Sequence, residues 1–239
     1  MDQYYQFGDY GSENKNSDYN VDVIMCIDAT GSMDPILDEV KSTALSFESL
    51  FREGMAATQK NVSKFRVKVI AFRDYIIDSV PMLQSEFFEL PAQNHQFKAF
   101  LDNIEASGGG DEPENSLESL AYALMSDWTN SGMKRRHVIL LFTDASAVPL
   151  GDRMGCRNYP SDLPKSLEEL AEMWEGCSQY FASNYESKAG RFIGFVPKKY
   201  PWTDMERSWK RAWFHFTDST GLKDINTSQI VDLLTRSVN

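Results

Sequence analysis

Three oxygen-bearing side chains follow an apolar segment near the start of the chain. The segment Val21–Asp28 (VDVIMCID) ends in a carboxylate, and the hydroxyls of Thr30 and Ser32 come next, with a small residue before each of them. One carboxylate and two hydroxyls on a tight loop suit a hard divalent cation such as Mg2+, which prefers oxygen ligands. These residues make only half of a site, so other parts of the chain must supply the remaining ligands.

Two later segments place acidic side chains where they could complete such a site. The Gly-rich segment 107–114 (SGGGDEPE) contains Asp111 and Glu114, and Asp144 comes two residues after the apolar run His137–Phe142. In an open α/β sheet, ligands gather at the loops that follow the carboxyl ends of the strands. All three segments are therefore predicted to face one site.

Apolar runs that favour strands alternate with segments whose apolar residues recur at helical spacing. The predicted strands are 22–28, 64–73, 137–142, 191–196 and 213–216; the predicted helices are 35–51, 94–104, 115–128, 167–174, 201–209 and 227–237. A short edge hairpin is expected within residues 80–90. This alternation predicts an α/β fold, a Rossmann-like open, mostly parallel twisted sheet with helices on both faces.

Composition narrows the class of protein. Residues 1–19 are polar and lack periodicity, which predicts a flexible arm, whereas residues 20–239 form the predicted domain. The net charge of −11 and the lack of a long Lys/Arg run argue against binding of nucleic acid. The three cysteines form no CxxC pair, and neither a signal peptide nor a membrane-spanning run is recognised. We therefore expect a cytoplasmic protein that has no membrane segment.

The three loops together resemble the von Willebrand factor type A domains, which carry a metal-ion-dependent adhesion site. The family's first loop, Asp-x-Ser-x-Ser, is matched by Asp28, Thr30 and Ser32, with Thr30 keeping the hydroxyl. An apolar strand that ends in Thr-Asp is matched by residues 140–144 (LLFTD). The second loop usually supplies a Thr, but segment 107–114 is similar to a Gly-Gly-x-Asp-x-Pro-Glu variant of the family.

The resemblance implies a divalent-metal site with Mg2+ bound, or alternatively Mn2+ or Ca2+. Its implied residues are Asp28, Thr30, Ser32, Asp111, Glu114 and Asp144. The hydroxyls would bind the ion directly, while Asp28 and Asp144 would lie partly behind them and orient them. A protein partner presenting an acidic side chain would complete the metal shell. Similarity to the intracellular bacterial TerY-like type further implies a cytoplasmic scaffold or sensor in a kinase- and phosphatase-linked stress or conflict system.

Other interpretations of the same residues were weighed. Haloacid-dehalogenase-type phosphatases also place an Asp after the first strand, but they need a second Asp as general acid where this chain has Thr30. The first loop could instead cap a helix, and Asp111 or Glu114 could complement a helix dipole. Arg73-Asp74 could line the same edge of the sheet, although a solvated ion pair is favoured. A binding module without enzymatic activity is the preferred prediction.

Overall fold

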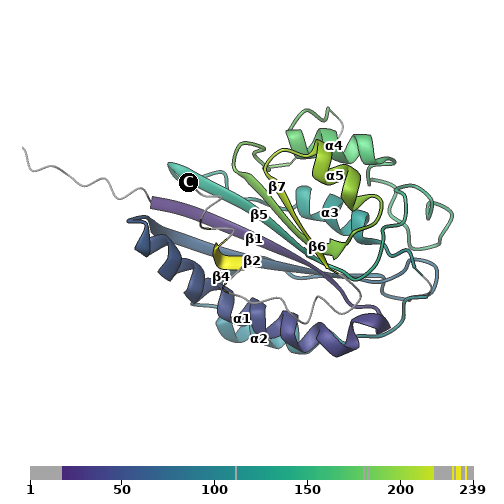
Figure 1. The fold of residues 1–239 in the computed structure, drawn as a ribbon, viewed down its shortest axis with the longest axis horizontal. Helices are drawn as coiled ribbons and strands as arrows, with labels where there is room; N and C mark the ends of the chain where they lie inside the picture. Colours follow the sequence, from purple (N-terminus) through teal and green to yellow (C-terminus); the bar gives the residue numbers. More distant parts are fainter. Residues whose placement is uncertain are drawn as a thin grey trace, which may run out of the picture.

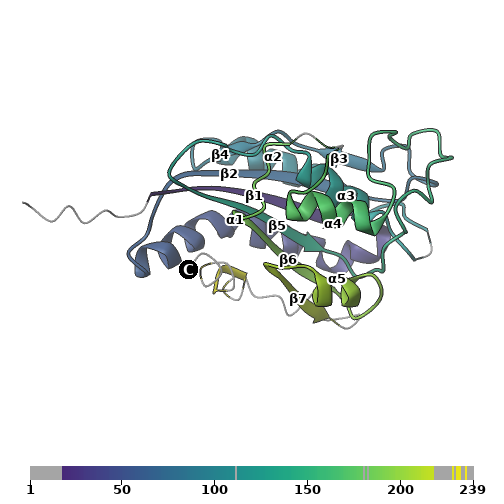
Figure 2. The same cartoon turned by 90° about the horizontal axis from the view of Figure 1, so that it is seen from above.

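The computed structural model describes residues 18–110, 112–179, 181, 183–217, 228, 230–232 and 235. Within these residues one seven-stranded sheet has the order β3-β2-β1-β5-β6-β7, and β4 also pairs with β2. The parallel strands are β1 (Asp18–Asp28), β2 (Asn61–Phe72), β5 (Lys134–Phe142), β6 (Gly190–Pro197) and β7 (Ala212–Thr217). Figure 2 shows these five strands side by side, from β2 at the top to β7 at the bottom. The predicted α/β fold with a mostly parallel sheet is confirmed.

Helices cover both faces of this sheet (Figure 1). The helices α1 (Asp34–Ala57) and α2 (Asn94–Asp102) lie on one face; α3 (Ser116–Leu124), α4 (Leu167–Glu175) and α5 (Trp202–Ser208) lie on the other. Successive side chains of a strand point to opposite faces. In β1, Val23 and Met25 therefore join the core beneath α1 and α2, while Ile24 and Cys26 join the core beneath α3 to α5. Burial on both faces explains why β1 is apolar without interruption from Val23 to Ile27.

The edge of the sheet beside β2 differs from the expected hairpin. The short strands β3 (Met82–Gln84) and β4 (Phe88–Leu90) do not pair with each other. β3 pairs antiparallel with residues 70–72 of β2, and β4 pairs antiparallel with residues 65–67. The two strands thus lie one after the other along β2 and satisfy its outer backbone groups, which would otherwise form an unpaired edge.

The two ends of the chain are only partly described. β1 begins at Asp18, so Asp18 and Tyr19 of the predicted arm are strand residues, while residues 1–17 lie outside the described residues. Of the predicted helix 227–237, residues 228, 230–232 and 235 are helical and the others lie outside the described residues. The division into an arm and a domain stays a prediction. In the described ranges, no helix is both long and apolar enough to cross a membrane.

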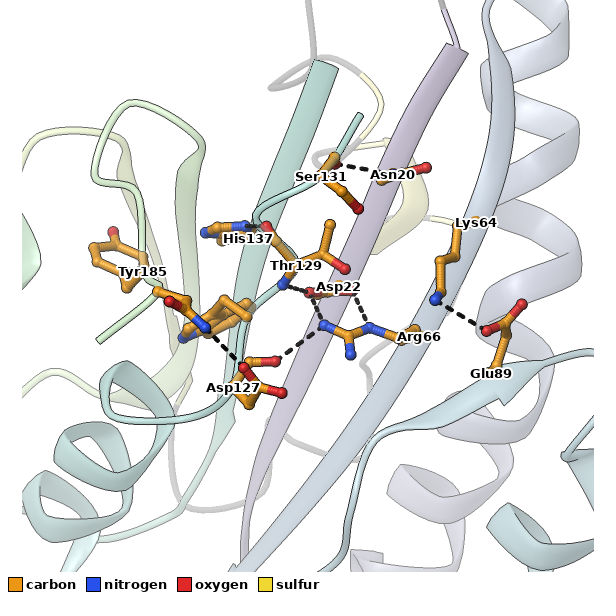
Figure 3. A network of polar contacts seen from close by, with 12 residues as sticks. Asn20, Asp22, Lys64, Arg66, Glu89, Asp127, Thr129, Ser131, His137 and Tyr185 are labelled. Atoms are coloured by element: carbon orange, nitrogen blue, oxygen red, sulfur yellow. Dashed lines mark hydrogen bonds and ion pairs between the residues drawn. The ribbon is translucent and has the colours of Figure 1, made fainter. Parts of the chain in front are cut away.

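A buried ion pair joins the first half of β1 to its neighbours (Figure 3). Asp22 is almost fully buried and lies opposite Arg66 of β2 and His137 of β5. The Arg66 guanidinium donates to both Asp22 carboxylate oxygens, from Nε at 2.8 Å and from a terminal nitrogen at 2.6 Å. The backbone N–H of Thr129 adds a third hydrogen bond to Asp22 at 2.6 Å. This geometry satisfies a charge that would otherwise be costly to bury.

His137 completes the same network as a neutral ring. Its Nδ1 accepts a hydrogen bond from the backbone N–H of Glu186 at 3.2 Å, which leaves Nε2 to donate to the Thr129 carbonyl at 3.0 Å. Burial lowers the pKa of His137 below its ordinary value. Thr129 therefore bonds to both Asp22 and His137, which links side chains of neighbouring strands at this end of the sheet.

Candidate functional site

The loops that follow β1 and β5 meet at Asp28, the last residue of β1. The backbone N–H and the hydroxyl of Thr30 donate to one carboxylate oxygen of Asp28, at 3.0 and 2.7 Å. The hydroxyl of Thr143, directly after β5, donates to the other oxygen at 2.6 Å. Asp28 is fully buried. Its side chain thus joins the first predicted loop to the third.

Ser32 and Asp144 extend this set of hydrogen-bonded side chains toward the surface. The Ser32 hydroxyl donates to Asp144 at 3.0 Å and lies 3.3 Å from the hydroxyl oxygen of Thr30. A hydroxyl that donates its proton to a carboxylate keeps lone pairs on oxygen for another electrophile. The two hydroxyl oxygens therefore lie next to each other in an orientation that a cation could use.

Glu114 is brought to the same place by a backbone bridge between the second and third loops. Its N–H donates to the Ser146 carbonyl at 2.9 Å, and its own carbonyl accepts from Val148 N–H at 2.8 Å. The Glu114 side chain is buried, and among the described residues its Oε2 has no hydrogen-bond partner. Such an unsatisfied buried oxygen calls for an explanation, and an ion bound beside it would supply one.

The electrostatics of the site favour an added positive charge. Burial, together with the neighbouring carboxylates of Asp28, Asp74, Asp78 and Asp144, raises the pKa of Glu114 to about 8. Burial also raises the pKa of Asp28 to about 6, although hydrogen bonds from Thr143 and Thr30 oppose the shift. Raised carboxyl pKa values in a cluster of like charges mean that ionisation is unfavourable there. A divalent cation would reverse this penalty.

The loop after β2 also reaches the site, which was the less favoured expectation for Arg73-Asp74. Arg73 does not pair with Asp74, the favoured expectation. Its guanidinium donates to the carbonyls of Ala29, Ser107 and Glu105, at 3.1, 3.1 and 2.7 Å. Arg73 therefore ties the loop after β1 to the Gly-rich loop, because one planar group bonds to backbone of both.

Asp74 and Asp78 add two more carboxylates at the end of the sheet where the parallel strands have their carboxyl ends. Asp74 is buried and pairs with Arg153 at 3.6 Å, while an Asp78 oxygen accepts from the backbone N–H groups of Gly109 and Asp74 at 3.0 and 3.1 Å. Their position just after a strand was the signal in the sequence that could have indicated them.

Gly109 lets the Gly-rich loop approach the site. Its φ is +67°, a conformation that side chains other than hydrogen disfavour. A Cβ at this position would lie 2.7 Å from the Cβ of Thr30 and 3.1 Å from Oε1 of Glu114. The glycine therefore permits close packing between two candidate ligands, which explains it without a bound phosphate.

The structure brings five of the six predicted site residues close to one another, while their role as metal ligands stays a prediction. Asp28, Thr30, Ser32, Glu114 and Asp144 lie together, and Asp111 lies outside the described residues. In the part of the chain that the structure describes, no group of three His, Cys, Asp or Glu side chains is arranged to hold a metal ion by itself. The donor set here differs in kind, because it mixes two hydroxyls with carboxylates.

Sequence comparison decides the family. A profile of the von Willebrand factor A domain matches residues 22–150, more than half of the chain and all three loops. The chain belongs to the von Willebrand factor A domain family. This domain is also similar to the alpha-protein kinase vwkA of Dictyostelium discoideum, with 21% identity over 183 residues, which are 75% of this chain and 28% of the kinase.

Solved structures share the fold of this von Willebrand factor A domain. The pilus adhesin SpaC of Lactobacillus rhamnosus GG matches with a TM-score of 0.56 and 10% identity, covering 92% of this chain and 30% of the adhesin. An open conformation of the same adhesin matches with a TM-score of 0.52 and 8% identity, over the same shares of the two chains. The domain spans less than a third of the length of the kinase and of the adhesin. At these identities the structural likeness concerns the fold alone.

Proposed function

We propose that this von Willebrand factor A domain is a divalent-cation-dependent protein-binding module. The observation that carries the proposal is the hydrogen-bonded set of Asp28, Thr30, Ser32 and Asp144 beside the unsatisfied oxygen of Glu114. Mg2+ suits these donors because it prefers oxygen ligands, and Mn2+ and Ca2+ are the alternatives. The family assignment agrees, since domains of this kind are typically interaction modules.

Each residue has a distinct part in this proposal. Thr30 and Ser32 would hold the ion through their hydroxyl oxygens, and Glu114 would hold it through the carboxylate oxygen that lacks a partner. Asp28 and Asp144 would keep the two hydroxyls oriented by accepting their protons. Asp111 stays a proposed member of the set. The bound cation would supply the charge that attracts a carboxylate of the partner.

The partner is proposed to be a protein that presents an acidic side chain, and the setting a cytoplasmic scaffold or sensor. The similarity to a protein whose name is alpha-protein kinase vwkA supports a kinase-linked setting. A role in stress or conflict responses belongs to the same proposal.

A phosphatase of the haloacid-dehalogenase type is a weaker explanation of the site. Asp28 would be its nucleophile, but this side chain is fully buried and both of its oxygens accept hydrogen bonds. Thr30 occupies the position of the general acid and cannot supply a proton at neutral pH. These two features support a module that binds over one that catalyses.

Replacing Ser32 by Ala tests the proposed ligand set. Ser32 is exposed, so the variant should melt like the wild type in chelator. Loss of one hydroxyl ligand should weaken Mg2+ and Mn2+ binding at least about 10-fold, measured by isothermal titration calorimetry. The matched control is Ser49→Ala, which removes an exposed hydroxyl from α1 and should leave the affinity unchanged. Equal affinities of Ser32→Ala and wild type would remove Ser32 from the site.

A further inference from the structure

Most of the exposed large apolar side chains among the described residues lie at the end of the sheet that carries the candidate metal site. Among the described residues, six large apolar side chains expose more than half of their surface. Five of them are Ile76, Ile77, Val80, Met154 and Tyr200, here called the apolar collar. All five lie in loops that follow the carboxyl ends of β2, β5 and β6. The sixth, Met133, comes just before β5 at the opposite end of the sheet.

The loop that carries Ile76 and Ile77 is held in place by several polar contacts. Arg73 fixes its start, and the backbone N–H of Ile76 donates to the Asp74 carboxylate. Ile77 reaches the Gly-rich loop, because its Cδ1 lies 2.6 Å from where a Cβ of Gly110 would be. The loop therefore holds these two isoleucines in exposed positions. Contiguous exposed apolar surface marks a site of interaction.

Ion pairs place the other side of the collar next to the same loops. Arg153, which precedes Met154, pairs with Asp74 at 3.6 Å. Lys199, which precedes Tyr200, pairs with Glu112 of the Gly-rich loop at 2.6 Å. The residues that precede Met154 and Tyr200 are thus paired with the loop after β2 and with the Gly-rich loop, at the same end of the sheet as the candidate site.

We propose that the apolar collar receives a partner segment whose metal-binding acidic residue is flanked by large apolar side chains. This proposal rests on the function proposed above and adds a rule for the sequence of the partner. The charges of the surface support it. Asp78, which accepts a hydrogen bond from Gly109, and Asp144, which accepts one from Ser32, lie beside the proposed cation and would repel further acidic residues, so the flanks are expected to be uncharged or basic. Apolar flanks would bury collar side chains that water now contacts.

A synthetic peptide library tests this rule directly. Its members carry one fixed central Asp with random residues on both sides, and they are selected on the full-length domain in Mn2+ and again in EDTA. The selection compares the wild type, the double variant Ile76→Ser/Ile77→Ser and the control Met133→Ser, which removes an equally exposed apolar side chain from the other end of the sheet. A thermal melt of each variant with and without Mn2+ reports metal binding independently.

The proposal predicts Mn2+-dependent selection of peptides with Leu, Ile, Phe or Met next to the Asp. The double variant should bind the best of these peptides at least about 10-fold more weakly, with an unchanged thermal response to Mn2+, whereas Met133→Ser should bind like the wild type. Selection without an apolar preference, no selection at all, or equal binding by the double variant would overturn the collar proposal. So would concentration-dependent self-association that the double variant abolishes, because a second copy would then be the occupant. Loss of the Mn2+ thermal response in wild type would instead count against the metal site.

Discussion

Replacing Asp28 by Asn should abolish the stabilisation of the domain by Mg2+ or Mn2+. A ligand at 100 times its dissociation constant stabilises a protein by about 2.7 kcal/mol. For a domain of this size each kcal/mol shifts the melting temperature by about 2–4 °C, so wild type should gain roughly 5–10 °C. The variant should gain nothing, because the residue that orients Thr30 and Thr143 has lost its charge.

The same substitution should not harm the domain when chelator is present. The pKa of Asp28 is raised to about 6, so the stability associated with this group is complete below its unfolded pKa of 3.8 and is lost as pH rises through 6. Asn does not ionise, so the variant avoids the loss of stability that wild type undergoes when Asp28 ionises. Its melting temperature should be equal to or above that of wild type at pH 7.5, and the difference between the two should be smaller at pH 5. Asp38→Asn, an exposed acid of α1, is the control for charge alone. A variant that unfolds in chelator would show that Asp28 is needed mainly for the stability of the fold.

Replacing Asp22 by Ala should have the opposite pattern: a large loss of stability with an intact response to cations. The change leaves the Arg66 guanidinium without its buried partner and removes the acceptor for Thr129 N–H. Removal of one partner of a buried pair costs about 3–5 kcal/mol, which corresponds to a melting temperature lower by roughly 10 °C. The measurement is a thermal or urea melt with and without Mn2+.

Asp18→Ala is the matched control for this change. Asp18 lies on the same strand and accepts a hydrogen bond from Asn61, but it is exposed, so its loss should cost no more than about 0.5 kcal/mol. If Asp22→Ala melts like Asp18→Ala, the network in Figure 3 does not hold the strands together.

The alternation of strands and helices was predictable because the central strands β1, β5 and β6 are buried on both faces over most of their length. The runs Val21–Asp28 and His137–Phe142 are therefore apolar at nearly every position, and the helices between them show periodic apolar residues. The paths of β3 and β4 were not predictable in the same way. Each has only three residues, and the position along β2 at which each pairs depends on tertiary structure.

The candidate site was predictable where its residues sit in short motifs directly after strands. Asp28, Thr30, Ser32 and Asp144 were found in this way, and the structure brings them into one hydrogen-bonded set. The contribution of the loop after β2 was expected only as the less favoured interpretation of Arg73-Asp74, and its contacts were not predicted. Arg73 acts through carbonyl oxygens, which are the same for any sequence, and Asp74 pairs with a residue far along the chain. No pattern in the local sequence predicts the contacts of Arg73 or of Asp74.

The apolar collar was also hidden in the sequence. Its five residues come from three separate loops, and an isolated Ile, Val, Met or Tyr in a loop carries no signal. Only the topology of the sheet, which places the carboxyl ends of β2, β5 and β6 at the same end, brings their loops to the end of the sheet that carries the candidate site.

We propose that a divalent cation binds between the hydroxyls of Thr30 and Ser32. A crystal of the wild-type domain grown with Mn2+ would locate the metal through its anomalous scattering. One strong anomalous peak is expected within bonding distance of the oxygens of Thr30 and Ser32, close to Glu114. No peak there at saturating Mn2+, or an ordered Mn2+ site only elsewhere on the domain, would show that these hydroxyls do not bind the ion.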